Sequence, residues 1–188
     1  MKIPCLLLLG LASLGGVAHA QNLLKNPSFE DVGSSPDTCA NWNRWGDWIN
    51  REDSWSPTHG GNCLIGYHHW QVTGDANSGM WQDVATVKAG QRFRFAVFVS
   101  ADAPDSGTLP AAKVELRLEA IRNGKEVQIE SKTTTVEELQ KTPGWHELSV
   151  TGTTPENNVR ALIVVTPASS GPRGGAVKID DAKLEAVK

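Results

Sequence analysis

The sequence predicts an all-β protein, an antiparallel β-sandwich of jelly-roll type, from three features: alternating residues, frequent turn signals and no helical periodicity. Phenylalanine and valine occupy every second position from Arg92 to Val99, and Arg92 and Arg94 stand between them. The segment from Lys113 to Glu119 repeats this alternation. Because successive side chains of a strand point to opposite faces, each segment would bury one face and leave the other solvated.

Turn residues divide the rest of the chain into further strands. Asn123-Gly124 is a strong signal for a tight hairpin, so the chain should return antiparallel over residues 126–135. A single helical turn is predicted at residues 136–140. Further strands are predicted at Leu23–Phe29, Cys63–Tyr67, Met80–Val87, Trp145–Thr151, Arg160–Val165 and Ala176–Leu184. About nine strands in one small domain indicate two packed sheets.

The first residues have the form of a signal peptide. Lys2 precedes an apolar stretch, and Ala18-His19-Ala20 has the small-x-small form of a cleavage site. Residues 1–20 are therefore predicted to be a signal peptide and residues 21–188 a single β-sandwich domain. The protein should be secreted, either extracellular or periplasmic.

Charge and hydropathy exclude two kinds of partner. The formal net charge is −3 with the signs scattered along the chain, which does not suit a phosphate backbone, so no nucleic-acid partner is expected. Beyond the leader no segment is long and apolar enough to span a bilayer, so no membrane insertion is expected.

Two cysteines follow the leader, Cys39 and Cys63. An even pair in an exported chain predicts a disulfide, with two free thiols as the alternative. Four of the seven tryptophans lie between them.

The order of several motifs resembles the carbohydrate-binding modules of families four, nine and twenty-two, within the galactose-binding-domain-like superfamily. The motifs are Asn22–Glu30, His59–Leu64, Met80–Val84, Gly144–Leu148 and Val177–Leu184. The resemblance implies the same sandwich and a non-catalytic role in binding a poly- or oligosaccharide.

The resemblance also implies a structural Ca²⁺ where the two terminal strands meet. Glu30, Asp180 and Asp181 would be its side-chain ligands, and the loop at residues 59–62 could supply backbone carbonyls. The alternative is that these acids are ordinary surface charges at strand ends.

The segment from Trp42 to Trp55, which we call the tryptophan-rich segment, combines aromatic rings with polar side chains. A pyranose has apolar C–H faces and a rim of hydroxyls, so its receptor needs flat rings beside amides, carboxylates or guanidiniums. Residues 67–70 form a second cluster of this kind. The residues predicted to bind ligand are Trp42, Trp45, Trp48, Trp55, Arg44, Asp47, Tyr67, His69, Trp70 and Trp81.

Two simpler readings remain open for these side chains. Some of the tryptophans could plug the end of the sandwich instead of facing solvent. Glu115, Arg117 and Glu119 share the solvated face of one strand, where they could hydrogen-bond sugar hydroxyls or simply solvate the sheet.

Two other functions compete with sugar binding. A structural or adhesive extracellular sandwich could use the same fold to bind another protein. A small glycan-active hydrolase or lyase would need opposed carboxyl groups, but Asp47, Glu52 and Asp53 all fall in one predicted loop. No catalytic residue is therefore predicted.

Overall fold

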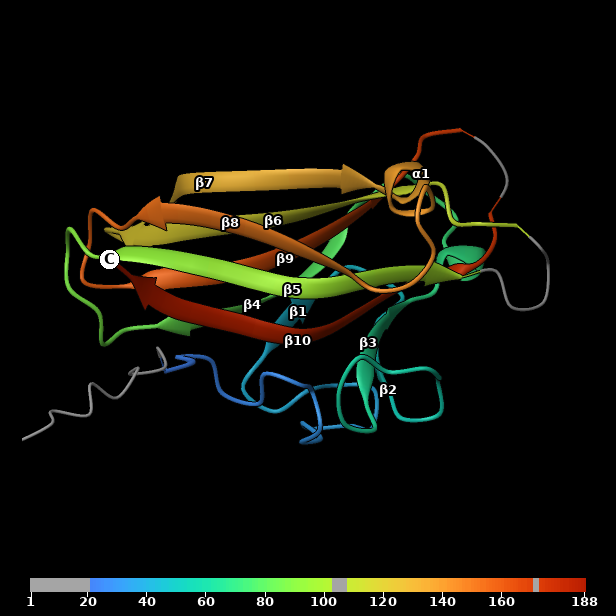
Figure 1. Ribbon diagram of the computed structural model, residues 1–188, viewed down its shortest axis with the longest axis horizontal. Coiled ribbons are helices and arrows are strands. Elements are labelled where there is room, and N and C mark those ends of the chain that lie inside the picture. Colours follow the sequence, from blue (N-terminus) through green and yellow to red (C-terminus); the bar gives the residue numbers. More distant parts are fainter. Residues whose placement is uncertain (1–20, 103–107, 171–172) are drawn as a thin grey trace, which may run out of the picture.

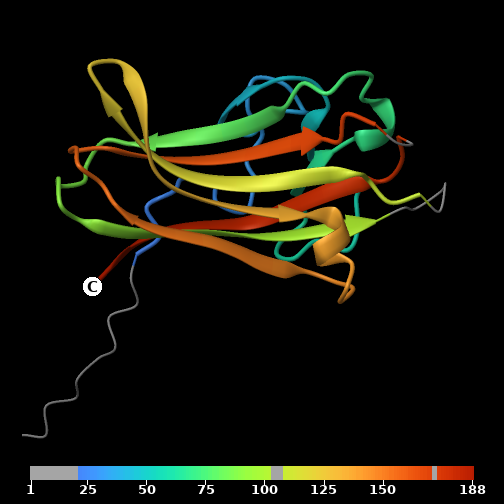
Figure 2. The ribbon, with the colours of Figure 1, turned by 90° about the horizontal axis from the view of Figure 1, so that it is seen from above.

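The computed structural model describes residues 21–102, 108–170 and 173–188, and the predicted signal peptide lies outside these ranges. The chain forms two antiparallel sheets packed face to face, seen edge-on as two layers in Figure 2. The predicted sandwich is therefore confirmed. Within the described ranges, no helix is both long and apolar enough to pass through a membrane.

Each sheet has five strands, labelled in Figure 1. The first sheet has the order β1 (Asn43–Trp45), β4 (Ser78–Val84), β9 (Val159–Pro167), β6 (Ala112–Arg122) and β7 (Lys125–Thr135). The second sheet has the order β2 (Ile49–Glu52), β3 (Leu64–Tyr67), β10 (Ala176–Val187), β5 (Arg92–Asp102) and β8 (His146–Thr153). Two short helical segments are η1 (His69–Gln71) and α1 (Val136–Leu139).

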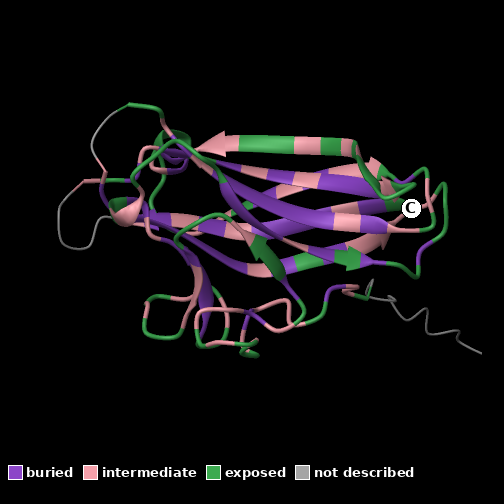
Figure 3. Cartoon of the chain, turned by 180° about the vertical axis from the view of Figure 1, so that it is seen from behind, coloured by how far each residue is buried: buried purple, intermediate pink, exposed green. Residues whose placement is uncertain are grey.

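The core lies between the sheets and is built from the inward side of each alternating strand. Buried and more exposed residues alternate along the central strands in Figure 3. On β5 the inward residues Phe93, Phe95 and Val97 are fully buried, and on β6 Leu116 and Leu118 face them as fully buried residues. This confirms the predicted alternation, because burial of the apolar face is what fixes strand register.

The N-terminal segment is not the predicted strand at Leu23–Phe29. Asn26 and Phe29 adopt φ values of 48° and 59°, which a strand cannot accommodate. The segment is tied to β10 instead, since the Leu23 N–H donates to the Leu184 carbonyl at 2.8 Å. The alternation of residues in the sequence does not reveal that Asn26 and Phe29 adopt left-handed backbone conformations.

The tryptophan-rich segment is also more ordered than predicted, since it contains β1 and β2. The loop that follows, residues 53–62, folds across the outer face of the second sheet. Lys178 on that face donates to the Ser56 carbonyl at 2.8 Å, and His59 stacks on Phe98 with ring centroids 3.6 Å apart. The outer face of the second sheet is thus partly covered by its own loop.

The predicted disulfide is wrong for this structure, because Cys39 and Cys63 are both buried free thiols. The Arg51 guanidinium donates to the Cys63 sulfur at 2.7 Å, and Cys39 pairs through its backbone with Val32. Burial raises the pKa of the Cys39 thiol to about 12, which keeps it protonated and unreactive in the folded protein.

Alkylation under denaturing conditions without reductant tests this correction. We expect iodoacetamide to label both Cys39 and Cys63 in unfolded protein, detected by peptide mass spectrometry, and to leave both unlabelled in folded protein. If neither peptide is labelled until a reductant is added, the two sulfurs are bonded and the correction is wrong.

Candidate functional site

Aromatic, apolar and charged side chains occupy different strands on the outer face of the first sheet. Strand register places Trp45, Gly79, Val164, Glu115 and Thr133 in one row across the five strands. The next row contains Asn43, Trp81, Leu162, Arg117 and Ser131. Residues directly opposite one another share a face, so each row is a line of neighbours. We call this surface, which carries Trp45, Trp81, Glu115 and Arg117, the open sheet face.

A glycine lets Trp45 lie against the sheet. A Cβ atom at Gly79 would stand 2.1 Å from the Trp45 ring and 2.4 Å from the Ile163 carbonyl oxygen, so only glycine leaves room for the indole. The Trp45 indole N–H donates to Asn77 Oδ1 at 3.0 Å, which fixes the orientation of the ring. The ring is therefore held against Gly79 of β4 while remaining partly exposed.

Trp81 extends the aromatic surface along β4. Its ring centroid lies 5.8 Å from that of Trp45, and the Arg160 guanidinium lies 5.3 Å from its centroid. Arg160 is in turn held by both carboxylate oxygens of Asp83, at 2.7 Å and 3.1 Å. The guanidinium lies over the Trp81 ring and is itself fixed by the carboxylate, so this cation–π contact holds the indole in place.

Charged groups lie on β6, which β9 separates from Trp81 and Trp45. Arg117 donates to both oxygens of Glu115, at 2.7 Å and 2.9 Å, and these hydrogen bonds raise the pKa of the Arg117 guanidinium. Both side chains are partly exposed. The open sheet face therefore combines a partly apolar floor with fixed donors and acceptors.

A second aromatic group lies at the outer face of the second sheet, near its β2 edge. His68 stands at its centre, with ring centroids 4.6 Å from Trp70, 4.8 Å from Trp55 and 6.3 Å from Trp48. His68 Nε2 lies 2.6 Å from Glu52 Oε1, and His68 Nδ1 lies 2.7 Å from the Gln71 side-chain oxygen. We call Trp48, Trp55, His68 and Trp70 the edge cluster.

Three residues predicted to bind ligand belong to the core. Trp42 is 8% exposed, packs against Phe29 and donates its indole N–H to the Asn26 carbonyl at 3.0 Å. Tyr67 and His69 are fully buried, and His69 contacts the backbone of Gly174. These three predictions are wrong. Trp42 packs against Phe29, the strand alternation of β3 turns Tyr67 inward, and His69 is held in the interior by Gly174.

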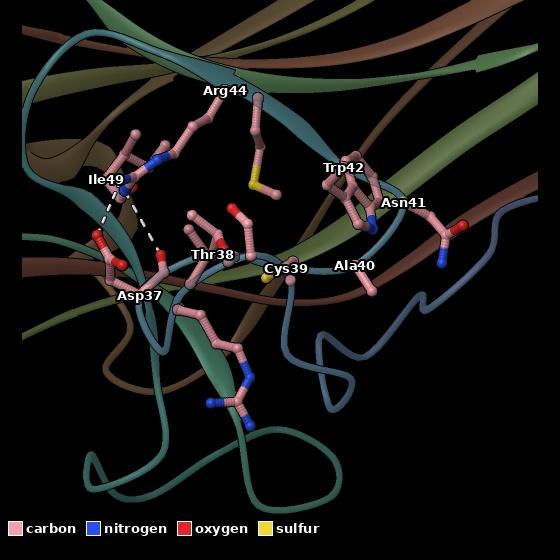
Figure 4. A pocket seen from close by; sticks show the side chains of 13 residues that line it. Asp37, Thr38, Cys39, Ala40, Asn41, Trp42, Arg44 and Ile49 are labelled. Carbon is pink, nitrogen blue, oxygen red and sulfur yellow. Dashed lines mark hydrogen bonds and ion pairs between the residues drawn. The ribbon is translucent and has the colours of Figure 1, made fainter.

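Arg44 belongs to a cavity between the sheets and not to either aromatic group. Figure 4 shows this cavity, of about 340 Å³, with Trp42 and Ile49 among its lining residues. Arg44 is ion-paired with Asp37 at 2.8 Å and donates to the Ile49 carbonyl at 2.9 Å. Its guanidinium thus ties β1 to β2, which is a structural task. Asp47, by contrast, is exposed in the turn between these strands.

The three acids predicted to bind calcium converge on one loop. Glu30 Oε1 accepts N–H groups of Asn62 and Cys63 at 2.8 Å and 3.0 Å. The fully buried Asp180 accepts those of His59 and Gly60, and desolvation raises the pKa of its carboxyl group. Asp181 Oδ2 lies 2.6 Å from His59 Nδ1.

These contacts fit a cation only in part. The convergence of acids on residues 59–63 suits calcium, as does a buried carboxylate that receives only N–H donors. However, the described ranges contain no group of three or more histidine, cysteine or acidic side chains arranged to hold one ion. Calcium therefore stays a prediction.

Sequence reasoning missed several residues of the two aromatic groups. His68 was not among the predicted ligands, although strand alternation puts it on the face opposite to Tyr67 and His69, which were. Asn77, which orients Trp45, has no sequence signal because it lies 32 residues away in the chain. Arg117 and Glu115 were considered, but only strand register shows that they share rows of the outer face with Trp81 and Trp45.

No family model and no curated protein sequence matches the chain. The fold is similar to that of carbohydrate-binding module TmCBM61, solved in complex with β-1,4-galactotriose, with a TM-score of 0.58, 21% identity and coverage of 89% of this chain and 100% of that one. It is also similar to the CBM22-1 xylan-binding domain of Xyn10C from Paenibacillus barcinonensis, with a TM-score of 0.57, 15% identity and coverage of 90% and 96%.

One similar structure belongs to an enzyme. The arabinose-bound α-L-arabinofuranosidase MgGH51 aligns with a TM-score of 0.60 and 15% identity, over 88% of this chain and only 26% of the enzyme. At these identities the similarity establishes the fold alone, a β-sandwich like that of these carbohydrate-binding modules. The predicted resemblance is confirmed at that level.

Proposed function

We propose that the protein is a secreted, non-catalytic carbohydrate-binding protein that holds a poly- or oligosaccharide on the open sheet face. The observation that carries the proposal is the side-by-side placement of Trp45 and Trp81 on the outer face of the first sheet, in the same two rows as the ion-paired Glu115 and Arg117. The apolar face of a pyranose can stack on the indoles while its hydroxyls reach the carboxylate and guanidinium.

Three further observations support binding over the alternatives. Solved structures of similar fold include modules with bound or named glycan ligands, one for β-1,4-galactotriose and one for xylan. A hydrolase would need two free opposed carboxyl groups, yet Glu115 is paired with Arg117 and Glu52 contacts His68. A structural role would place the rings in the core, whereas only Trp42 of the four in the segment is buried there.

Titration against a polysaccharide panel tests the proposal. We expect tryptophan fluorescence to change on addition of at least one of β-1,4-galactan, xylan or other neutral plant and microbial polysaccharides, with an affinity in the weak range that two stacked rings support. An unchanged spectrum with every polysaccharide, in protein shown to be folded, would contradict the function.

Thermal unfolding of the same protein tests the calcium prediction. If the acids around residues 59–63 hold calcium, the melting temperature falls when a chelator is added and recovers with excess calcium. An unchanged melting temperature means that the N–H contacts of Glu30 and Asp180 suffice to anchor the loop, and the calcium prediction is then wrong.

A further inference from the structure

The edge cluster contains the most exposed indoles of the described ranges. Trp70 is 46% exposed and Trp48 is 39% exposed. The other two rings support them: Trp55 lies across Gly66 of β3, where a Cβ atom would stand 2.5 Å from its ring, and His68 is clamped between Glu52 and Gln71. The two exposed indoles of the cluster are therefore supported by two rings that are themselves held in place.

Trp48 adopts a backbone conformation that its side chain disfavours. Its φ is 62°, in the left-handed region that glycine adopts freely and bulky residues rarely adopt. The conformation is locked from both sides, since the His68 N–H donates to the Trp48 carbonyl at 2.8 Å and the Ser78 hydroxyl donates to the Asp47 carbonyl at 2.7 Å. Strain of this kind persists where it serves a function, and here it directs an indole to solvent.

A hollow with polar walls opens beside the Trp48 ring. Its volume is about 240 Å³, and its lining includes Asp47, Thr73 and Asn77. A ring face for stacking thus adjoins a space with a carboxylate, a hydroxyl and an amide, which is the combination that a hydroxylated ring requires. The Asp47 carboxylate in its wall would repel a uronic acid, so the chemistry favours a neutral sugar.

The edge cluster and the open sheet face belong to different sheets. The turn between β1 and β2 sends Trp45 to the outer face of the first sheet and Trp48 to that of the second, only three residues later. A left-handed glycine at Gly46, with φ of 75°, permits this reversal. The two groups of rings therefore lie on the outer faces of different sheets, although Asn77, which orients Trp45, also lines the hollow beside Trp48.

We propose that the edge cluster is a second binding site for a neutral glycan, so that one protein molecule bridges two polysaccharide strands. The proposal rests on the proposed function, since the two sites are assigned the same ligand class. Its new content is the second site, the stoichiometry of two and the bridging of strands.

Stoichiometry and bridging test the proposal together. The probes are the polysaccharide that the unaltered protein binds in the panel, and a hexasaccharide of its backbone. Isothermal titration with the hexasaccharide should give two ligands per chain, and the polysaccharide should become turbid at an intermediate protein concentration, where bridging is greatest, and clear again in excess protein.

Variants separate the two sites. Trp48→Gly removes the indole and fits the left-handed backbone, so the melting temperature should be kept while the stoichiometry falls to one and turbidity disappears. Trp70→Ala should weaken the second site by about tenfold. Trp145→Ala, an indole outside both sites, is the matched control and should retain two ligands and turbidity.

Each outcome decides between the two proposals. A stoichiometry of one in the unaltered protein, unchanged by Trp48→Gly, overturns the second site and leaves the proposed function standing. If Trp48→Gly also abolishes binding at the open sheet face, the two groups of rings form one continuous site. That result overturns the second site as well. Binding of no panel glycan overturns both proposals.

Discussion

The double variant Trp45→Ala, Trp81→Ala should lower the affinity of the open sheet face for its glycan by roughly 100-fold. Each aromatic stack contributes about 1.5 kcal/mol beyond its buried area at the upper end of the usual range. Two stacks therefore amount to about 3 kcal/mol, and each 1.4 kcal/mol is a factor of ten in the dissociation constant. Isothermal titration in the Trp48→Gly background measures this site alone.

The control for this prediction is Trp145→Ala, which removes an indole of the same size from the packing of His59 and Phe98. It should change affinity by less than about twofold, well under the 1.4 kcal/mol that marks a tenfold change. Equal losses in the control and in the double variant would mean that the open sheet face does not hold the glycan.

Gly79→Ala should be the most destabilising small substitution on the open sheet face. The added carbon would overlap both the Trp45 ring and the Ile163 carbonyl of the neighbouring strand, and the carbonyl belongs to the sheet and cannot move aside. Overpacking costs up to about 3 kcal/mol, which lowers the melting temperature of a domain of this size by roughly 10 °C. Glycan binding should weaken as well, because Trp45 is displaced.

Two comparisons make this prediction specific. Gly74→Ala is the matched control, since a Cβ atom there finds only one atom, at 3.9 Å, and the melting temperature should be unchanged. In a Trp45→Ala background, Gly79→Ala should cost less, because one of its two overlaps has been removed. Equal costs in both backgrounds would show that Trp45 does not lie over Gly79.

The sandwich could be predicted from sequence because its signal is local. Alternation along residues such as Phe93, Phe95 and Val97 fixes both the strand and its buried face. The same rule failed at Leu23–Phe29, where left-handed residues break an apparent strand, and it gave no warning of β1 and β2, which are too short for periodicity to detect.

The site was harder to predict because it depends on register between distant strands. The sequence identified Trp45, Trp48, Trp55, Trp70 and Trp81 as candidates, but treated the tryptophan-rich segment as one surface. The structure divides these rings between two sheets, through a reversal at Gly46 and Trp48 that depends on two left-handed residues. Burial of Trp42, and the commitment of Arg44 to Asp37, likewise follow from packing across the fold and not from residue type.

The most direct test of glycan binding on the open sheet face is the indole N–H region of a ¹⁵N-correlated NMR spectrum, with the seven tryptophans assigned by single substitution to phenylalanine. During titration with the bound hexasaccharide, the Trp45 and Trp81 signals should shift progressively, while the Trp42 signal should stay in place. Shifts confined to other indoles, with Trp45 and Trp81 unmoved at saturation, would contradict the account.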